Sequence, residues 1–150
     1  MIASGDRLSS AARRAKDSLI EVIVRLLKRF HAREFVHRDL KAANVLVKLP
    51  SDESGAPRAW LVDVDGVRRK RRASEWQRLR PLVRLSVSLE VSPHVTRTDR
   101  LRFLKRYLLA PGRTDRNWKA VWRRLAVEAD RKRTLKSQRD AWKLKHYGRT

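Results

Sequence analysis

An eight-residue polar string followed by a strand–turn–strand pattern constrains the fold of this chain more than any other feature. The string is His37-Arg38-Asp39-Leu40-Lys41-Ala42-Ala43-Asn44. Residues 45–49 then have the pattern of a short apolar strand, residues 50–57 are rich in turn formers, and residues 59–62 have the pattern of a returning strand. An antiparallel hairpin brings the start of its first strand beside the end of its second. We therefore expect Asn44 and Asp63 to be neighbours.

These residues form a set of oxygen-bearing side chains that suits phosphoryl transfer, in which the protein mainly positions groups and neutralises charge. Asp39 is the candidate catalytic group that orients an attacking hydroxyl and accepts its proton. Lys41 could reach the transferred phosphate as a point charge. Asn44 and Asp63 are candidate ligands of a hard cation such as Mg²⁺, which prefers oxygen. Asp65 is a second candidate ligand, because alternation along a strand would turn it to the same side as Asp63.

The polar string matches the catalytic-loop pattern H-R-D-L-x-x-x-N of protein kinases at every fixed position. Residues 31–40 as a whole resemble the helix end and catalytic loop of the kinase fold. In this interpretation His37 packs and hydrogen-bonds to shape the loop and is not a general base. Arg38 would pair with a carboxylate or a phosphate.

Residues 82–89 and 96–108 resemble more specifically the bacterial lipopolysaccharide kinase family, whose members phosphorylate heptose or Kdo sugars of the lipopolysaccharide core. The string 63–65 is similar to the D-F-D-like metal motif of that family, which replaces the usual D-F-G. The resemblance covers about residues 15–110. It implies ATP as donor, Mg²⁺ as cofactor, Asp39 as the catalytic aspartate, and Asn44 and Asp63 as metal ligands.

The chain departs from the kinase pattern on the side that holds ATP. Gly5 is the only glycine before the catalytic loop, and the sequence contains no G-x-G-x-x-G. Lys16 and Lys28 lie in a helical pattern, whereas the kinase lysine lies on a strand. We therefore expect a mainly α fold with a small β-hairpin, corresponding to the C-terminal lobe of a protein-kinase-like fold. The ATP-gripping N-terminal lobe is expected to be absent, as in a truncated chain, or to be supplied by another chain.

We expect a single domain over residues 1–150, with the catalytic loop at 37–44, the metal motif at 63–66 and a helical remainder over about 74–145. Helical spacing of apolar residues predicts a helix over 11–30 that braces the catalytic loop. A second helix is predicted over 74–90, in which Pro81 should introduce a bend or mark the true start. Thr98 is the expected N-cap of a third helix over 99–109, which Pro111 and Gly112 would end. A last helix is expected from Asp115 to about Lys145.

The charge of the chain is strongly positive. Thirty-eight basic against sixteen acidic residues give a formal net charge of +22. Such a chain will bind polyanions, namely anionic glycolipid, anionic lipid headgroups or, as a weaker expectation, nucleic acid. Five consecutive basic residues are candidates for holding an anionic glycolipid beside the cleft: Arg68, Arg69, Lys70, Arg71 and Arg72. The alternative interpretation of this run is a solvated basic loop without a specific ligand.

A second class of function stays open beside the kinase. It is a noncatalytic basic binding module, either a pseudokinase remnant or a helical protein associated with RNA or membranes. The chain has no cysteine, no apolar run of membrane-spanning length and no apolar signal-peptide core near Met1. These observations favour a cytoplasmic location, with peripheral contact at the cytoplasmic face of the inner membrane as a further expectation.

The aromatic and histidine side chains outside the polar string are interpreted as structural. Trp118 and Trp122 lie four residues apart, so they share one helical face and are expected to be packing residues. Trp76 and Trp142 are expected to be partly buried. The remaining histidines show no metal-ligand spacing and are expected to be structural or exposed: His31, His94 and His146.

Overall fold

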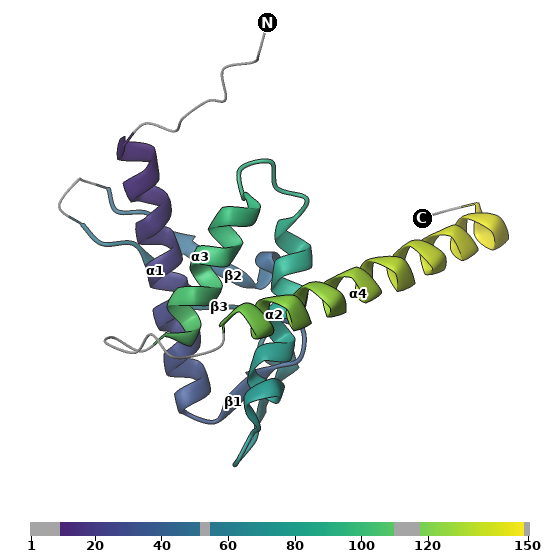
Figure 1. Cartoon of the computed structure of the whole chain (residues 1–150), viewed down its shortest axis with the longest axis horizontal. Coiled ribbons are helices and arrows are strands. Elements are labelled where there is room, and N and C mark those ends of the chain that lie inside the picture. The colour runs from purple at the N-terminus through teal and green to yellow at the C-terminus, as the bar shows by residue number, and fades with distance from the viewer. Residues whose placement is uncertain (1–9, 52–54, 110–117, 149–150) are drawn as a thin grey trace, which may run out of the picture.

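The computed structural model describes residues 10–51, 55–109 and 118–148. Its elements are α1 (Ser10–Ala32), β1 (Phe35–His37), β2 (Val45–Lys48), β3 (Arg58–Leu61), β4 (Val67–Arg69), α2 (Glu75–Leu89), α3 (Arg97–Leu108) and α4 (Trp118–Tyr147). Two 3₁₀ turns, η1 (Ala42–Asn44) and η2 (Val64–Gly66), precede β2 and β4. Figure 1 shows α1 and α3 side by side, whereas the C-terminal part of α4 projects away from the rest of the molecule. The predicted mainly helical fold with a small hairpin is confirmed.

The apolar stripe of the first helix faces the interior, as the helical spacing predicted. Ile20, Val24 and Leu27 of α1 are buried, and His31 in its last turn is buried with them. Lys28 of α1 donates a hydrogen bond to the carbonyl of Leu109, which ties the helix to the end of α3. The helix therefore braces the region that leads into the catalytic loop.

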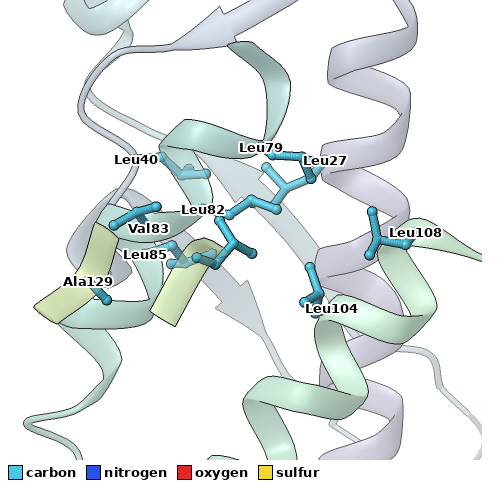
Figure 2. Close-up of a cluster of buried hydrophobic side chains, with 10 residues drawn as sticks. Leu27, Leu40, Leu79, Leu82, Val83, Leu85, Leu104, Leu108 and Ala129 are labelled. Atoms are coloured by element: carbon cyan, nitrogen blue, oxygen red, sulfur yellow. The ribbon is translucent and has the colours of Figure 1, made fainter. Parts of the chain in front are cut away.

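The main core lies where four helices meet the catalytic loop, and Figure 2 shows its side chains. Leu27 comes from α1, and Leu104 and Leu108 come from α3. The other members come from the loop, α2 and α4: Leu40, Leu79, Leu82, Val83, Leu85, Leu125 and Ala129. Leu40 is fully buried. Full burial of a leucine is worth about 1.5–3 kcal/mol, so this side chain fixes the catalytic loop to the core.

The predicted hairpin is formed by β2 and β3. The strands are antiparallel, with Val45 opposite Leu61 and Leu46 opposite Trp60. The amide of Val62 donates to the carbonyl of Asn44 at 3.0 Å, so the pairing continues up to the catalytic loop. Val45 and Leu61 pack against the core on one face. On the other face Leu46 and Trp60 remain 53% and 45% exposed.

A second antiparallel pair, β1 with β4, was not predicted. His37 lies opposite Val67, and Phe35 lies opposite Arg69. The amide of Lys70 donates to the carbonyl of Glu34 at 2.7 Å and extends the pair by one bond. The basic run 68–72 had a solvated loop as one of its two interpretations, but its first two residues lie on a strand. The run begins on a strand because its backbone hydrogen-bonds to the backbone of β1, which leads into the catalytic loop.

The starts of α2 and α3 are set by capping boxes. Ser74 caps α2 together with Gln77, and Pro81 lies inside the helix and does not mark its start. The N-cap of α3 is Thr96. The prediction that Thr98 is the N-cap is therefore wrong. The hydroxyl of Thr96 accepts from the amide of Asp99, and the Asp99 carboxylate accepts from the amide of Thr96. This reciprocal pair satisfies two backbone donors and moves the helix start two residues earlier.

The last helix carries the two tryptophans that were predicted to pack. Trp118 and Trp122 of α4 pack against the core, and Trp76 of α2 packs against it as well. Trp142 was expected to be partly buried, but it is 51% exposed because the end of α4 has no neighbour among the described residues. The expected stop at Pro111 and Gly112 and the expected start at Asp115 lie outside the described residues. In the ranges that the structure describes, no helix is long and apolar enough to cross a bilayer.

Candidate active site

The side-chain amide of Asn44 joins the catalytic loop to the metal motif. Its Nδ2 atom donates to the carbonyl of Asp39 at 2.9 Å and to Oδ2 of Asp63 at 3.3 Å. Asn44 is 4% exposed. The structure therefore places Asn44 and Asp63 side by side, as the hairpin geometry predicted. Both of these hydrogen bonds use the amide nitrogen of Asn44. They leave the amide oxygen available, and oxygen is the ligand that a hard cation prefers.

Asp63 reaches Asn44 through an unusual backbone conformation. It has a φ of 59° in the left-handed region, which aspartate adopts more readily than most residues. Strand β3 ends at Leu61, and residues 64–66 form the turn η2. The prediction that strand alternation turns Asp65 to the same side as Asp63 is wrong, because β3 ends at Leu61. Asp65 is exposed on the turn, and its carbonyl accepts from Arg68.

His37 and Gly66 fix the relative position of the two motifs. His37 is 1% exposed, and its Nδ1 accepts from the amide of Asp39 at 3.2 Å. A methyl group at Gly66 would lie 2.9 Å from two ring atoms of His37. The amide of Arg38 donates to the carbonyl of Gly66 at 2.8 Å. His37 thus shapes the loop by packing and hydrogen bonding, which agrees with the interpretation of the sequence.

The carboxylate of Asp39 lies between two cations. Arg84 of α2 lies 2.6 Å from its Oδ1, and Lys41 lies 3.2 Å from its Oδ2. Partial burial by itself raises the pKa of Asp39, but the hydrogen bond from Lys41 and the charges of Arg84 and Lys41 outweigh it, so the net pKa is lowered. Asp39 is therefore ionised at neutral pH. It suits the orientation of a hydroxyl better than strong general-base catalysis.

Two residues of α2 that support the catalytic loop were missed by the sequence analysis. Arg84 pairs with Asp39, and the hydroxyl of Ser88 accepts from the amide of Ala42 at 2.8 Å. Arg84 and Ser88 are four residues apart, one turn along the same helical face. The sequence gives no distinct signal for these two residues, because α2 contains several other polar and charged side chains.

The basic run 68–72 does not act as one unit. Arg68 turns back on its own segment and donates to the carbonyls of Asp65 and Val67. Arg69 pairs with Glu34 at 3.4 Å. Arg71 and Arg72 are exposed. Arg68 and Lys70 line a cavity beside the loop, together with Arg38.

The residues present fit a divalent cation that is completed by ligands from a substrate. No cluster of three or more His, Cys, Asp or Glu side chains with metal-binding geometry occurs among the residues that the structure describes. Asn44 and Asp63 supply one amide and one carboxylate. Mg²⁺ is commonly held by one or two carboxylates, several waters and substrate phosphates, so a sparse protein set of this kind suits it.

Comparison with known proteins gives the family. A model described as the lipopolysaccharide kinase (Kdo/WaaP) family matches residues 2–124. The chain belongs to this lipopolysaccharide kinase family. The resemblance found in the sequence is thereby confirmed, and the residues that carried it lie inside the matched region. No curated protein gives a significant match.

A solved structure has the same fold as this lipopolysaccharide kinase family member. It is described as WaaP in complex with acyl carrier protein, and it is similar with a TM-score of 0.61 at 23% sequence identity. The match covers 85% of this chain and 51% of that chain. The chain therefore spans about half the length of that structure, and the likeness concerns the fold alone.

Proposed function

We propose that this chain forms the acceptor- and metal-binding part of a kinase that transfers phosphate from ATP to a sugar hydroxyl of the lipopolysaccharide core. The observation that carries the proposal is the side chain of Asn44, which bridges the catalytic loop and the metal motif. The bridge places the two candidate metal ligands beside each other and next to the catalytic aspartate. Family membership supports the substrate class.

Asp39 has the role of orienting the acceptor hydroxyl. Phosphoryl transfer passes through a loose transition state, so the attacking oxygen needs little activation and a carboxylate of lowered pKa suffices. Arg84 and Lys41 hold the two carboxylate oxygens in place. Lys41 is half exposed and can turn from Asp39 to the transferred group, where its positive charge offsets the developing negative charge.

Asn44 and Asp63 are the residues that would hold Mg²⁺. When bound, the ion would neutralise charge on the phosphates of ATP. Asp63 offers a carboxylate oxygen, and Asn44 offers the amide oxygen that its anchoring bonds do not use. Burial of Asn44 keeps its side chain in one orientation and so reduces the entropy lost on binding.

The ATP-binding groups that the sequence lacks must come from elsewhere for turnover. A kinase of this fold needs a Gly-rich loop and a strand lysine. We propose that a further polypeptide segment or a partner chain supplies them. The exposed pair Leu46 and Trp60 on the open face of the hairpin is the surface against which such a segment would pack. The assembled kinase would act at the cytoplasmic face of the inner membrane.

The test is ATP-dependent phosphorylation of deacylated lipopolysaccharide core by this chain joined to the part of WaaP that the match leaves uncovered. Asp39→Asn should lower the rate by a factor on the order of 10²–10⁴, because hydroxyl orientation and proton acceptance fail together. Asp63→Asn should raise the Mg²⁺ concentration needed for half-maximal rate. Asp140→Asn, which removes the same charge on the far part of α4, should leave both quantities unchanged. A wild-type rate in Asp39→Asn excludes this mechanism.

A noncatalytic basic module is the second candidate, and one observation favours it. Asp39 is already ion-paired on both oxygens, and the chain carries a net charge of +22. This candidate requires salt-dependent binding to anionic glycolipid that survives loss of the catalytic side chains. A salt titration of the double variant Asp39→Asn, Asn44→Ala measures it. Binding that disappears in the double variant would contradict a purely electrostatic module.

A further inference from the structure

A basic cavity of about 570 Å³ lies beside the catalytic loop. Six of its ten lining residues are cationic: Arg38, Arg68, Lys70, Arg80, Arg84 and Lys132. No Asp or Glu side chain of the described residues lines it. A concave surface with one sign of charge concentrates counter-ions far more strongly than a flat one, so the cavity is built to attract an anion.

The cations of this cavity come from four separate parts of the fold. Arg38 follows β1, whereas Arg68 and Lys70 belong to β4 and the residue after it. Arg80 and Arg84 lie one turn apart on α2, and Lys132 comes from α4. Their convergence depends on the packing of α2 against both α4 and β1. The charges are therefore placed by the tertiary structure and not by one basic run.

The cationic groups repel one another in the structure as it stands. The pKa of Lys132 is lowered by partial desolvation first, and then by the charges of Arg84 and Arg80, with Asp39 opposing the change. Arginine cannot relieve the repulsion by losing its proton. A bound anion with several oxygens would relieve it and would accept hydrogen bonds from more than one guanidinium.

Arg84 connects the cavity to the catalytic carboxylate. Its guanidinium lines the cavity and lies 2.6 Å from Oδ1 of Asp39. An anion in the cavity thus lies one side chain away from the group that orients the acceptor hydroxyl. The anion and the acceptor hydroxyl can therefore be two substituents of the same sugar.

We propose that the cavity binds a phosphate monoester carried by the acceptor sugar, so that the substrate is a sugar already phosphorylated at another position. This inference rests on the proposed function. It adds Arg80 and Lys132 as binding residues for that phosphate, and it requires that an earlier phosphoryl transfer to the same glycolipid supplies the substrate.

Binding of glucose 6-phosphate to the chain at 0.15 M salt tests the proposal. The wild-type protein should bind glucose 6-phosphate and should not bind glucose, as measured by NMR titration. Arg80→Gln and Lys132→Gln should each weaken binding about tenfold, the usual effect of losing a hydrogen bond to a charged group. Arg139→Gln is the matched control, because it removes one charge from an exposed part of α4 outside the cavity. It should weaken binding less than twofold.

Three results would overturn the proposal. Equal weakening in all three variants would mean that overall charge, and not the cavity, binds the anion. If inorganic phosphate bound as tightly as glucose 6-phosphate, the cavity would recognise phosphate alone and not a sugar phosphate. Displacement of glucose 6-phosphate by ATP would assign the cavity to the nucleotide. Circular dichroism of each variant checks that the helices are intact.

The outcome is separable from that of the kinase assay. Binding of glucose 6-phosphate needs no ATP and no nucleotide-binding part. If the cavity binds the sugar phosphate but the joined protein does not phosphorylate the core, the proposed kinase fails and the phosphate site stands. If phosphorylation proceeds equally well on a core without phosphate, the kinase stands and the inference fails.

Discussion

The guanidinium of Arg84 in α2 lies 2.6 Å from the carboxylate of Asp39, 45 residues earlier in the chain. This contact couples the helical part of the fold to the catalytic loop. Both side chains are about one-third to two-fifths exposed, so solvent screens the pair. The pair therefore acts mainly on the position and pKa of Asp39 and adds little to stability.

Arg84→Gln should raise the pKa of Asp39 toward the ordinary value for aspartate. The change removes one of the positive charges that hold this pKa down. The carboxyl carbon of Asp39, followed by NMR from pH 2 to 7, measures it. Arg139→Gln should leave the pKa unchanged. An unaltered titration in Arg84→Gln would contradict the electrostatic role given to Arg84.

Gly66→Ala should destabilise the fold by about 1–3 kcal/mol, the usual cost of overpacking a tight site. The added methyl group would overlap the buried ring of His37, which has little room to move. Urea unfolding measures the free energy. Val64→Ala in the same turn is the control, since Val64 is 66% exposed and the substitution should change stability by less than about 0.5 kcal/mol. Equal effects of the two substitutions would show that the ring contact is unimportant.

Thr96→Ala should cost about 1 kcal/mol, whereas Thr98→Ala should cost much less. Thr96 makes both bonds of the capping box, and Thr98 lies exposed within the first turn of α3. Thermal or urea unfolding of the two variants compares them directly. A larger loss in Thr98→Ala would place the start of α3 two residues later.

Acidification should destabilise the protein between about pH 6.5 and pH 4 through His31. Burial first, and then the charge of Arg78, lower the pKa of His31 to about 4. The unfolded chain has the ordinary histidine pKa, so in this window it binds the proton that the folded state excludes. Stability is complete above pH 6.5 and falls by about 3 kcal/mol as the pH drops through the window.

The measurement is urea unfolding of the wild type and of His31→Gln at pH 7 and pH 4.5. The variant keeps a polar partner for the hydroxyl of Tyr107, which lies 2.6 Å from Nδ1 of His31. It should lose most of the pH dependence. His146→Gln, at an exposed site on α4, should keep it. A wild-type pH dependence in His31→Gln would rule out His31 as its source.

Local patterns made part of the site predictable. The turn-rich residues between two short strands predicted the hairpin, and the hairpin topology then predicted that Asn44 lies beside Asp63. The start of α3 was predictable as well. Thr96 and Asp99 have the spacing of a capping box, which is a stronger N-cap signal than a lone threonine at Thr98.

The remaining features depend on tertiary packing. Strand β4 consists of a valine and two arginines, which have no apolar alternation, and it forms because β1 offers a free backbone edge. Lys132 reaches the cavity beside the catalytic loop because α4 packs on α2, and nothing in its local sequence indicates this. The left-handed backbone of Asp63 likewise has no sequence signal, since an aspartate before Val-Asp-Gly also suits an ordinary turn.

The exposed Leu46 and Trp60 have a consequence for handling the protein. They form an exposed apolar surface on the molecule. Copies of the molecule repel one another, because each carries a net charge of +22. That repulsion reaches about 30 Å at 0.01 M ionic strength but only about 8 Å at 0.15 M. Rising salt screens this repulsion and allows the apolar surfaces of two copies to meet. We therefore expect the protein to be most soluble in dilute buffer. We expect it to self-associate at the high salt concentrations that are used to remove nucleic acid from basic proteins.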